Sequence, residues 1–354
     1  MNKIAVIGCG GFIGVHLVER LLELGYEVDG WDLDDHRLAM IRNHAQFHFH
    51  HTDYSSAHEI DDISSHQIVI HLAALCNPSL YNTQDELVIS SNFMQPATLV
   101  QACVHKGSWL IFFSTCEVYG RTLHGHAETA GVPFTNELQR DQIDLLREDS
   151  PILLGSTEAR RWSYASAKQL LERYLIGLAG YPNFRWTVVR PFNFLGPAMD
   201  FIPGIDGEGL PRVMACFMHA LLNNQPLSLV DGGKNRRCFT WIGDAVEAIV
   251  AILEHPEKAR NQCFNIGNPQ NEIDMRGLAE RMCVLYTQIT GKTAPGMVSV
   301  SSAEFYGAGY EDSDRRLPDV SKALRLLGWK PHTSLDITLQ RTVEWFLDKY
   351  QEHS

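Results

Sequence analysis

The first 35 residues constrain the fold more than any other stretch, because they contain three patterns in a fixed order. Residues 3–7 ("KIAVI") form a short apolar run, as expected for a parallel strand that is covered on both faces. Leu17, Leu21 and Leu24 then recur at helical spacing. Residues 26–32 ("YEVDGWD") follow as a second strand. This order predicts an α/β fold with a doubly wound parallel sheet, the Rossmann arrangement.

The turn after the first predicted strand is rich in glycine, with Gly8, Gly11 and Gly14 in a GxxGxxG spacing. A dinucleotide site needs such residues, since glycine permits the tight turn and lets the backbone approach the pyrophosphate. The helix that follows would direct the N–H groups of its first turn, at Phe12 and Ile13, toward the phosphates. We therefore expect these five residues to bind a dinucleotide cofactor.

Residues at the next strand ends refine this expectation. Asp32 ends the second strand, where a carboxylate can bind both ribose hydroxyls and would repel a 2′-phosphate, which favours NAD over NADP. Asp53 ends a third strand and is expected near the adenine amino group. Leu72, Ala73 and Ala74 follow a fourth strand, and the small residues there would leave room for the cofactor.

The pentapeptide "YASAK" places Tyr164 and Lys168 four residues apart, on one face of a helix. A phenol with an ordinary pKa of about 10 is a poor base at neutral pH. A nearby ammonium stabilises the phenolate, which can then act as the general base of a hydride-transfer reaction. The pair is more specific here because it follows a dinucleotide motif and a strand end that carries Thr115.

The overall composition excludes several classes of partner. The net charge of −12 argues against nucleic acid, and no apolar run reaches the roughly 18–20 residues of a membrane helix. The eight cysteines are scattered without a CxxC pair, so we expect no metal site. The N-terminus enters a strand without the apolar core of a signal peptide. These features predict a cytoplasmic enzyme with reduced thiols.

The whole chain resembles the extended short-chain dehydrogenase/reductase family. The resemblance rests on the glycine turn, Asp32, Asp53, "HLAA" (71–74), "STCEVYG" (114–120), "YASAK" and "RPFNFLGP" (190–197). It implies an NAD that stays bound through the reaction, with Asn92 among its contacts, and a nucleotide-sugar substrate. It also implies a homodimer formed through the helix that carries Tyr164.

Some segments are similar to two narrower families. Residues 301–319 ("SSAEFYGAGYEDSDRRLPD") are similar to the C-terminal motif of UDP-glucuronic acid decarboxylases of the polymyxin-resistance type. The UDP-apiose/UDP-xylose synthase family matches better, also through "AALCNP", "RRWSYASAKQLLER" (160–173) and "MDFIPGIDGEGLPRVMACF" (199–217). That family carries cysteines at the positions of Cys76 and Cys116, whereas the decarboxylases carry serine at the second position.

The resemblance also implies the site residues. The implied catalytic residues are Cys76, Thr115, Cys116, Glu117, Tyr164, Lys168 and Arg316. The implied substrate contacts are Tyr81, Glu117, Arg161, Asn193, Arg212, Lys234, Arg237, Tyr310 and Arg316. Strand alternation would place Thr115 and Glu117 on one side, and Arg315 is expected to be an exposed neighbour of Arg316. Ser228 departs from the lysine that both narrower families carry in this segment.

We expect residues 1–190 to form mainly the NAD-binding Rossmann domain, with a return segment at about 236–265. Residues 191–354 would form mainly a smaller nucleotide-sugar-binding domain.

The resemblance implies that C4 of UDP-glucuronic acid is oxidised and that the resulting β-keto acid loses CO₂. Retro-aldol cleavage, re-addition and reduction would then yield UDP-apiose, with UDP-xylose as co-product. A thiol can serve as acid or base near neutral pH, whereas a serine hydroxyl cannot. Two alternatives stay open: a decarboxylase that stops at the 4-ketopentose or at UDP-xylose, and a non-catalytic NAD-binding regulator.

Overall fold

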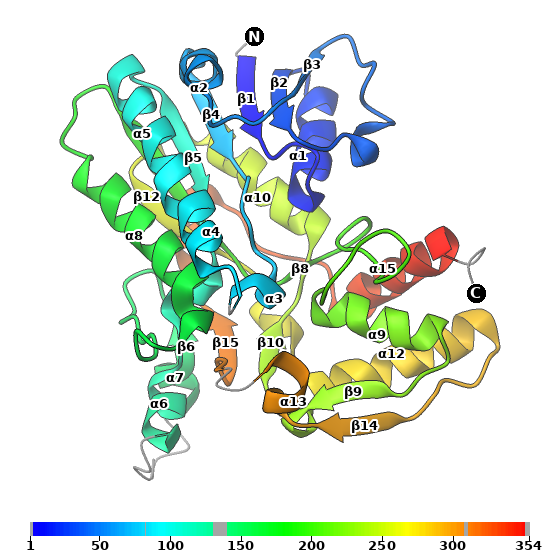
Figure 1. Cartoon of the computed structure of the whole chain (residues 1–354). Coiled ribbons are helices and arrows are strands. Elements are labelled where there is room, and N and C mark those ends of the chain that lie inside the picture. The colour runs from blue at the N-terminus through cyan, green and yellow to red at the C-terminus, as the bar shows by residue number, and fades with distance from the viewer. Residues whose placement is uncertain (1–2, 82, 130–139, 308–310, 351–354) are drawn as a thin grey trace.

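A seven-stranded parallel sheet forms the centre of the computed structural model, which describes residues 3–81, 83–129, 140–307 and 311–350 (Figure 1). The strands lie in the order β12 (Gln262–Ile266), β7 (Arg185–Pro191), β5 (Trp109–Phe113), β4 (Ile68–His71), β1 (Lys3–Ile7), β2 (Glu27–Asp32) and β3 (Phe47–His51). The order reverses between β1 and β4, and ligands bind beyond the carboxyl ends of strands at such a switch point. The predicted doubly wound sheet is confirmed.

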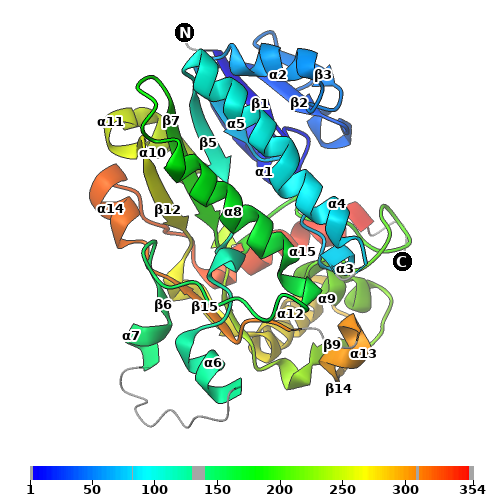
Figure 2. The same ribbon diagram turned by 60° about the vertical axis from the view of Figure 1, so that its left-hand side comes forward.

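Helices cover both faces of this sheet. One face carries α1 (Phe12–Glu23), α10 (Ile242–Glu254) and α14 (Ser321–Leu327), and the other carries α2 (Ala57–Ser64), α5 (Gln95–Lys106) and α8 (Ser163–Gly177) (Figures 1 and 2). Ile4 and Val6 of β1 pack into the first layer, and Ala5 and Ile7 into the second. The apolar run of β1 is therefore buried on both faces, as its sequence predicts.

The rest of the chain forms smaller sheets and a separate apolar cluster. That cluster joins α9 (Val213–Leu222), α12 (Met275–Thr290) and α15 (Leu335–Tyr350). The sheets are β13 (Glu272–Asp274)–β10 (Arg236–Cys238)–β15 (Arg315–Pro318)–β6 (Leu145–Leu146), β14 (Met297–Val300)–β9 (Leu227–Val230) and β11 (Thr240–Trp241)–β8 (Phe194–Leu195). Within the predicted return segment, α10 and β12 belong to the main sheet layers and β10 does not. The domain boundary at residue 190 stays a prediction.

Short helices connect these elements, and besides the 3₁₀ turns at residues 36–38, 160–162, 231–233 and 269–271 the described residues form eight others. They are α3 (Pro78–Tyr81), α4 (Asp85–Ile89), the π-helical turn η2 (Ser90–Met94), the 3₁₀ turn η3 (Cys116–Tyr119), α6 (Leu123–Thr129), α7 (Arg140–Asp144), α11 (Pro256–Ala259) and α13 (Ser302–Tyr306). In the part of the chain that the structure describes, no helix combines the length and the apolarity that crossing a bilayer requires.

Two glycines of the predicted turn occupy positions that exclude any side chain. Gly8 has a φ of +83°, and a Cβ there would lie 2.7 Å from the backbone nitrogen of Ala73. A Cβ on Gly14 would lie 2.1 Å from the carbonyl oxygen of Gly8. These contacts bring the start of α1 and the chain after β4 against the end of β1, so backbone atoms pack closely at the switch point.

A buried ion pair fixes α8 against the sheet. Arg190, in β7, donates from Nε and Nη2 to the two carboxylate oxygens of Glu172 in α8, at 3.0 and 2.6 Å. It also donates to the Tyr119 hydroxyl at 2.7 Å. Both charged side chains are almost fully buried. The register of α8 over the carboxyl ends of the strands therefore depends on this pair.

Replacing Glu172 by glutamine is expected to lower the free energy of unfolding by about 3 kcal/mol, because the Arg190 guanidinium would stay buried without a balancing charge. Urea denaturation measures this loss. Glu257→Gln is the control, since Glu257 pairs with Arg260 at the surface and such pairs contribute about 1 kcal/mol or less. Equal losses in both variants would contradict the anchoring role of Glu172.

Candidate active site

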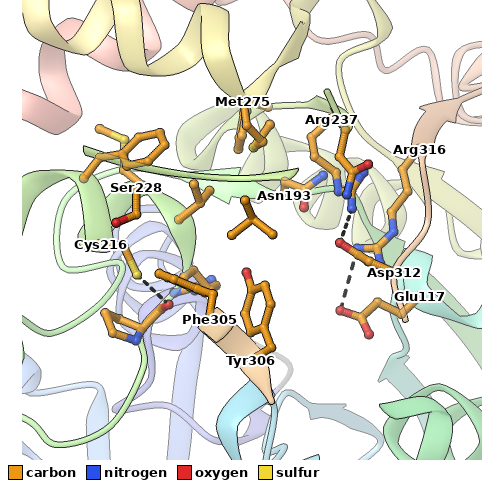
Figure 3. Close-up of a pocket in the computed structure, with 18 of the residues that line it drawn as sticks. Glu117, Asn193, Cys216, Ser228, Arg237, Met275, Phe305, Tyr306, Asp312 and Arg316 are labelled. Carbon is orange, nitrogen blue, oxygen red and sulfur yellow. Dashed lines mark hydrogen bonds and ion pairs between the residues drawn. The ribbon is translucent and has the colours of Figure 1, made fainter. Parts of the chain in front are cut away.

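A cavity of about 360 Å³ lies beside the ends of the small sheets, within the size range of small-molecule sites (Figure 3). Seven residues predicted for the site line it: Cys76, Glu117, Arg161, Asn193, Arg212, Arg237 and Arg316. They come from segments that lie far apart in the sequence. Ser228 of β9 also lines the cavity, at the end away from Glu117.

Three arginines meet two carboxylates at one end of the cavity, and we call Arg161, Arg237 and Arg316 the arginine cluster. Arg161 donates to Glu117 Oε2 at 2.7 Å, and Arg316 Nη1 lies 3.7 Å from Glu117 Oε1. Although burial opposes ionisation, Arg161 and Arg316 lower the pKa of Glu117 below its ordinary value. Glu117 is therefore ionised at neutral pH and faces the cavity.

The prediction that strand alternation places Thr115 and Glu117 on one side is wrong, because Glu117 does not lie in a strand. Strand β5 ends at Phe113, and residues 116–119 form the 3₁₀ turn η3. Thr115 caps this turn, since its hydroxyl accepts a hydrogen bond from the Glu117 N–H at 3.1 Å. The turn, and not the pleat, directs the Glu117 carboxylate toward the arginine cluster.

Tyr164 and Lys168 share one face of α8, as their spacing predicts. Burial raises the pKa of Tyr164 well above its ordinary value, and a hydrogen bond with Thr115 acts in the opposite direction. Lys168 donates to the Phe113 carbonyl at 3.0 Å, and burial lowers its pKa to about 8. Lys168 is therefore still mostly protonated at pH 7, and it can provide positive charge near the phenol.

The two cysteines of the predicted site differ in exposure. Cys76 is exposed at the cavity wall, whereas Cys116 is buried behind Glu117. Burial raises the pKa of Cys116, and the Arg316 guanidinium partly offsets this by a hydrogen bond and by its charge. Both sulfur atoms lie close enough to Tyr164 to act on its ionisation. The fold therefore brings the two thiols to the same phenol.

The cradle at the end of β1 fits the adenosine part of a dinucleotide. Asp32 ends β2 and accepts hydrogen bonds from the N–H groups of Gly10, at 2.8 Å, and Asp34, at 3.1 Å. A carboxylate has about four lone-pair sites, so the Asp32 oxygens keep acceptor capacity for a ribose hydroxyl. Asp53 is exposed two residues after β3. Phe12 and Ile13 begin α1, as expected.

The other predicted cofactor contacts lie beside the end of β1 or support the chain there. Leu72 and Ala73 donate their N–H groups to the carbonyl of Ile7, which holds residues 72–74 beside the end of β1. The buried Asn92 donates to the carbonyl of Leu75 at 3.0 Å and to that of Val88 at 2.9 Å. Asn92 therefore braces the chain after β4, and its contact with the cofactor stays a prediction.

Two predicted substrate contacts, Tyr81 and Lys234, are not among the residues that line the cavity. Tyr81 is buried and stacks on Tyr164 with ring centres 5.2 Å apart, so it supports that phenol from behind. Lys234 is exposed and lies outside the residues that line the cavity. Tyr310 falls outside the described residues.

The expected exposure of Arg315 is wrong. Arg315 and Arg316 alternate along β15, which lies between β10 and β6, so both are covered. Arg315 binds Glu272 through Nε and Nη2 and faces Asp144 at 3.6 Å. His124, Asp144 and Asp314 have the ligand types of a metal site and lie close together there. The Arg315 guanidinium already brings positive charge to this group.

Several residues of the cavity were not predicted from the sequence. Asp312 binds two members of the arginine cluster, and Phe305 and Tyr306 project from α13 into the space between its ends (Figure 3). The resemblance over residues 301–319 included these three residues, but no local pattern separated them from their neighbours. Cys216 also lines the cavity, and although the resemblance included residues 199–217, no local pattern marked this cysteine.

Comparisons with known proteins agree with this geometry. The NAD dependent epimerase/dehydratase family matches residues 4–267. UDP-D-apiose/UDP-D-xylose synthase 2 of Arabidopsis thaliana is 42% identical over 99% of this chain and 92% of its own. The UDP-D-apiose/UDP-D-xylose synthase of Oryza sativa subsp. japonica is 41% identical over 99% and 90% of the two chains.

Solved structures show the same fold. The PbgP3 protein of Burkholderia pseudomallei has a TM-score of 0.80 at 28% identity, over 99% of this chain and 97% of its own. UDP-glucuronic acid 4-epimerase of Bacillus cereus, solved with UDP-glucuronic acid and NAD, has a TM-score of 0.78 at 22% identity, over 98% and 100%. The chain belongs to the NAD dependent epimerase/dehydratase family and, within it, to the UDP-D-apiose/UDP-D-xylose synthase family.

Proposed function

We propose that this chain converts UDP-glucuronic acid into UDP-apiose, with UDP-xylose as co-product, and that it retains NAD through each cycle. The observation that carries the proposal is the presence of two thiols, Cys76 and Cys116, around the phenol of Tyr164 and beside the arginine cluster. The names of the plant relatives support it, because the match covers nearly the full length of both chains.

The redox steps use the residues around α8. The glycine turn and Asp32 would hold NAD, which supplies the oxidising equivalent for C4 and later the reducing equivalent. Tyr164 takes the proton of the C4 hydroxyl, and Lys168 stabilises the phenolate that does so. Thr115 forms a hydrogen bond with the same phenol. Its short side chain, fixed by the cap of η3, keeps the phenol and the sugar oxygen in line.

The decarboxylation step uses the charged end of the cavity. A ketone at C4 makes the C5 carboxylate part of a β-keto acid, so its electrons can move into the ketone when CO₂ leaves. Arg316 binds this carboxylate before the step, and the ionised Glu117 orients Arg161 and Arg316 toward it. The enolate that forms must then be protonated at C5.

The route to a branched sugar requires a further base and a further acid near C2 and C3. The 2-hydroxyl lies β to the ketone, so a base that removes its proton allows the C2–C3 bond to break. Re-addition then forms the branched carbon skeleton, and reduction of the exposed aldehyde completes it. Burial raises the pKa of Cys116, so its thiol is present at neutral pH and can donate a proton. Cys76 is exposed and takes the role of the base.

Incubation of the purified protein with UDP-glucuronic acid and NAD⁺ is expected to release CO₂ and to yield two UDP-pentoses without net formation of NADH. NMR of the products identifies the branched and the unbranched sugar. If UDP-xylose or a 4-ketopentose is found and no branched sugar, the protein is a decarboxylase and the proposed synthesis of UDP-apiose is wrong. No change in the substrate would contradict both activities.

The variant Cys116→Ser is expected to decarboxylate UDP-glucuronic acid within about tenfold of the original rate and to form no branched sugar, because a hydroxyl cannot exchange a proton at neutral pH as a thiol can. The same NMR assay measures both outcomes. Cys216→Ser is the matched control, since Cys216 lines the other end of the cavity and should leave the product ratio unchanged. Persistent formation of UDP-apiose by Cys116→Ser would contradict the role of this thiol.

We further infer that the protein is a cytoplasmic homodimer. Its cysteines are free in the described residues, as expected of a reducing compartment. Helices α4 and α8 lie side by side (Figure 2), and η2 packs against both. Large apolar side chains are exposed on these three elements, among them Leu87, Met94 and Leu170. An apolar surface of this kind is typical of a subunit interface.

Light scattering during gel filtration is expected to give the mass of two 39.9 kDa chains. Leu170→Lys should convert the dimer into monomers, because it would place a charge within the buried interface. Leu324→Lys is the control, since Leu324 is equally exposed on α14, which covers the opposite face of the sheet. A monomeric wild-type protein would rule out the dimer.

A further inference from the structure

Asp312 lies at the centre of the charged end of the cavity, between two arginines from different strands (Figure 3). Its Oδ2 accepts a hydrogen bond from Arg237 Nη2 at 2.7 Å, and its Oδ1 accepts one from Arg316 Nη2 at 3.1 Å. Arg161 Nη2 lies 3.7 Å from the same Oδ1. One carboxylate therefore touches all three members of the arginine cluster, whereas Glu117 touches two.

A hydrogen bond to the backbone fixes the position of the Asp312 carboxylate. Oδ1 of Asp312 also accepts the N–H of Ser313 at 2.8 Å, and the hydroxyl of Ser313 in turn donates to the carbonyl of Arg315 at 2.9 Å. The side chain is thus tied to the start of β15, four residues before Arg316. A carboxylate on a longer side chain could not keep the bond to Ser313 and the same position between the guanidinium groups.

The charged end of the cavity joins three guanidinium groups to the carboxylates of Glu117 and Asp312. Although burial opposes ionisation, Arg237, Arg316 and Arg161 lower the pKa of Asp312 to about 2, so it is ionised at neutral pH. Guanidinium groups that are held in fixed places can bind a ligand carboxylate through charge-assisted hydrogen bonds.

We propose that Asp312 is a positioning residue that makes the cavity select sugars carrying a carboxylate. It holds Arg237 and Arg316 side by side against their mutual repulsion, so that both guanidinium groups are placed to bind one carboxylate of the sugar. This inference rests on the proposed function, because it assigns the carboxylate of UDP-glucuronic acid to these guanidinium groups. Without Asp312 the two guanidinium groups would separate, and the sugar carboxylate would have to bring them together.

This proposal is tested by measuring ligand affinities calorimetrically with protein that carries the substitution Tyr164→Phe. That substitution stops turnover and keeps the aromatic stack on Tyr81. The two ligands are UDP-glucuronic acid and UDP-xylose, which differ only in the carboxylate. Adding Asp312→Asn is expected to weaken the binding of UDP-glucuronic acid about tenfold, the size of one charge-assisted hydrogen bond, and that of UDP-xylose by less than about twofold.

Asp314→Asn in the same background is the matched control. Asp314 lies two residues away and binds the hydroxyl of Thr122, away from the arginine cluster, so neither affinity should change. Equal weakening of both ligands by Asp312→Asn would mean a general structural role and would overturn the proposal. Tighter binding of UDP-glucuronic acid would mean that Asp312 competes with the substrate, which would also overturn it.

Asp312→Glu serves if the asparagine variant does not fold, since it keeps the buried negative charge. We expect it to lower the preference for UDP-glucuronic acid over UDP-xylose at least about threefold, because it cannot keep the Ser313 bond and both arginine contacts. An unchanged preference would count against the positioning role. If the Tyr164→Phe protein binds UDP-glucuronic acid more tightly than UDP-xylose while the wild type does not convert it, the proposed reaction is wrong. The affinities of the Asp312 variants would still test the positioning role in that case.

Discussion

The charged end of the cavity depends on the balance between three guanidinium groups and two carboxylates. These side chains come from the turn after β5, the 3₁₀ turn that precedes α8 (Arg160–Trp162), strand β10, strand β15 and the segment leading into β15. Buried charges must be paired to be stable, so this network joins the main sheet to the smaller sheets and sets the distance between them. The cavity for a nucleotide sugar exists where these parts meet.

The redox residues are held by a different kind of contact. Tyr164 and Lys168 share a face of α8, and that helix is fixed to β7 by the pair of Glu172 and Arg190. Tyr81 stacks on the phenol from the other side. Helix α8 therefore joins the charged end of the cavity to the main sheet, because its first turn follows Arg161 and its third turn is anchored to β7.

The cofactor half of the site could be predicted from the sequence to a large extent, because its signals are local. The glycine turn, the helix after it and Asp32 lie within 35 residues, and each requires a particular residue type at a particular spacing. Lys234 and Arg315 were predicted less well. Arg315 is adjacent to the cavity residue Arg316, and only the course of β15 decides which of the two side chains faces the cavity. Lys234 lies before β10, at the end of the turn formed by residues 231–233, where its side chain is exposed.

The sequence alone determined the parallel sheet, the nucleotide cradle and the spacing of the tyrosine and lysine, since each follows from apolar periodicity or from steric needs of the backbone. Only the tertiary structure decided that Glu117 is aimed by a 3₁₀ turn, that Cys116 is buried while Cys76 is exposed, and that Asp312 completes the arginine cluster. Burial and charge balance arise from contacts between segments that are remote in the chain. No local pattern records them, because they are properties of the assembled cavity.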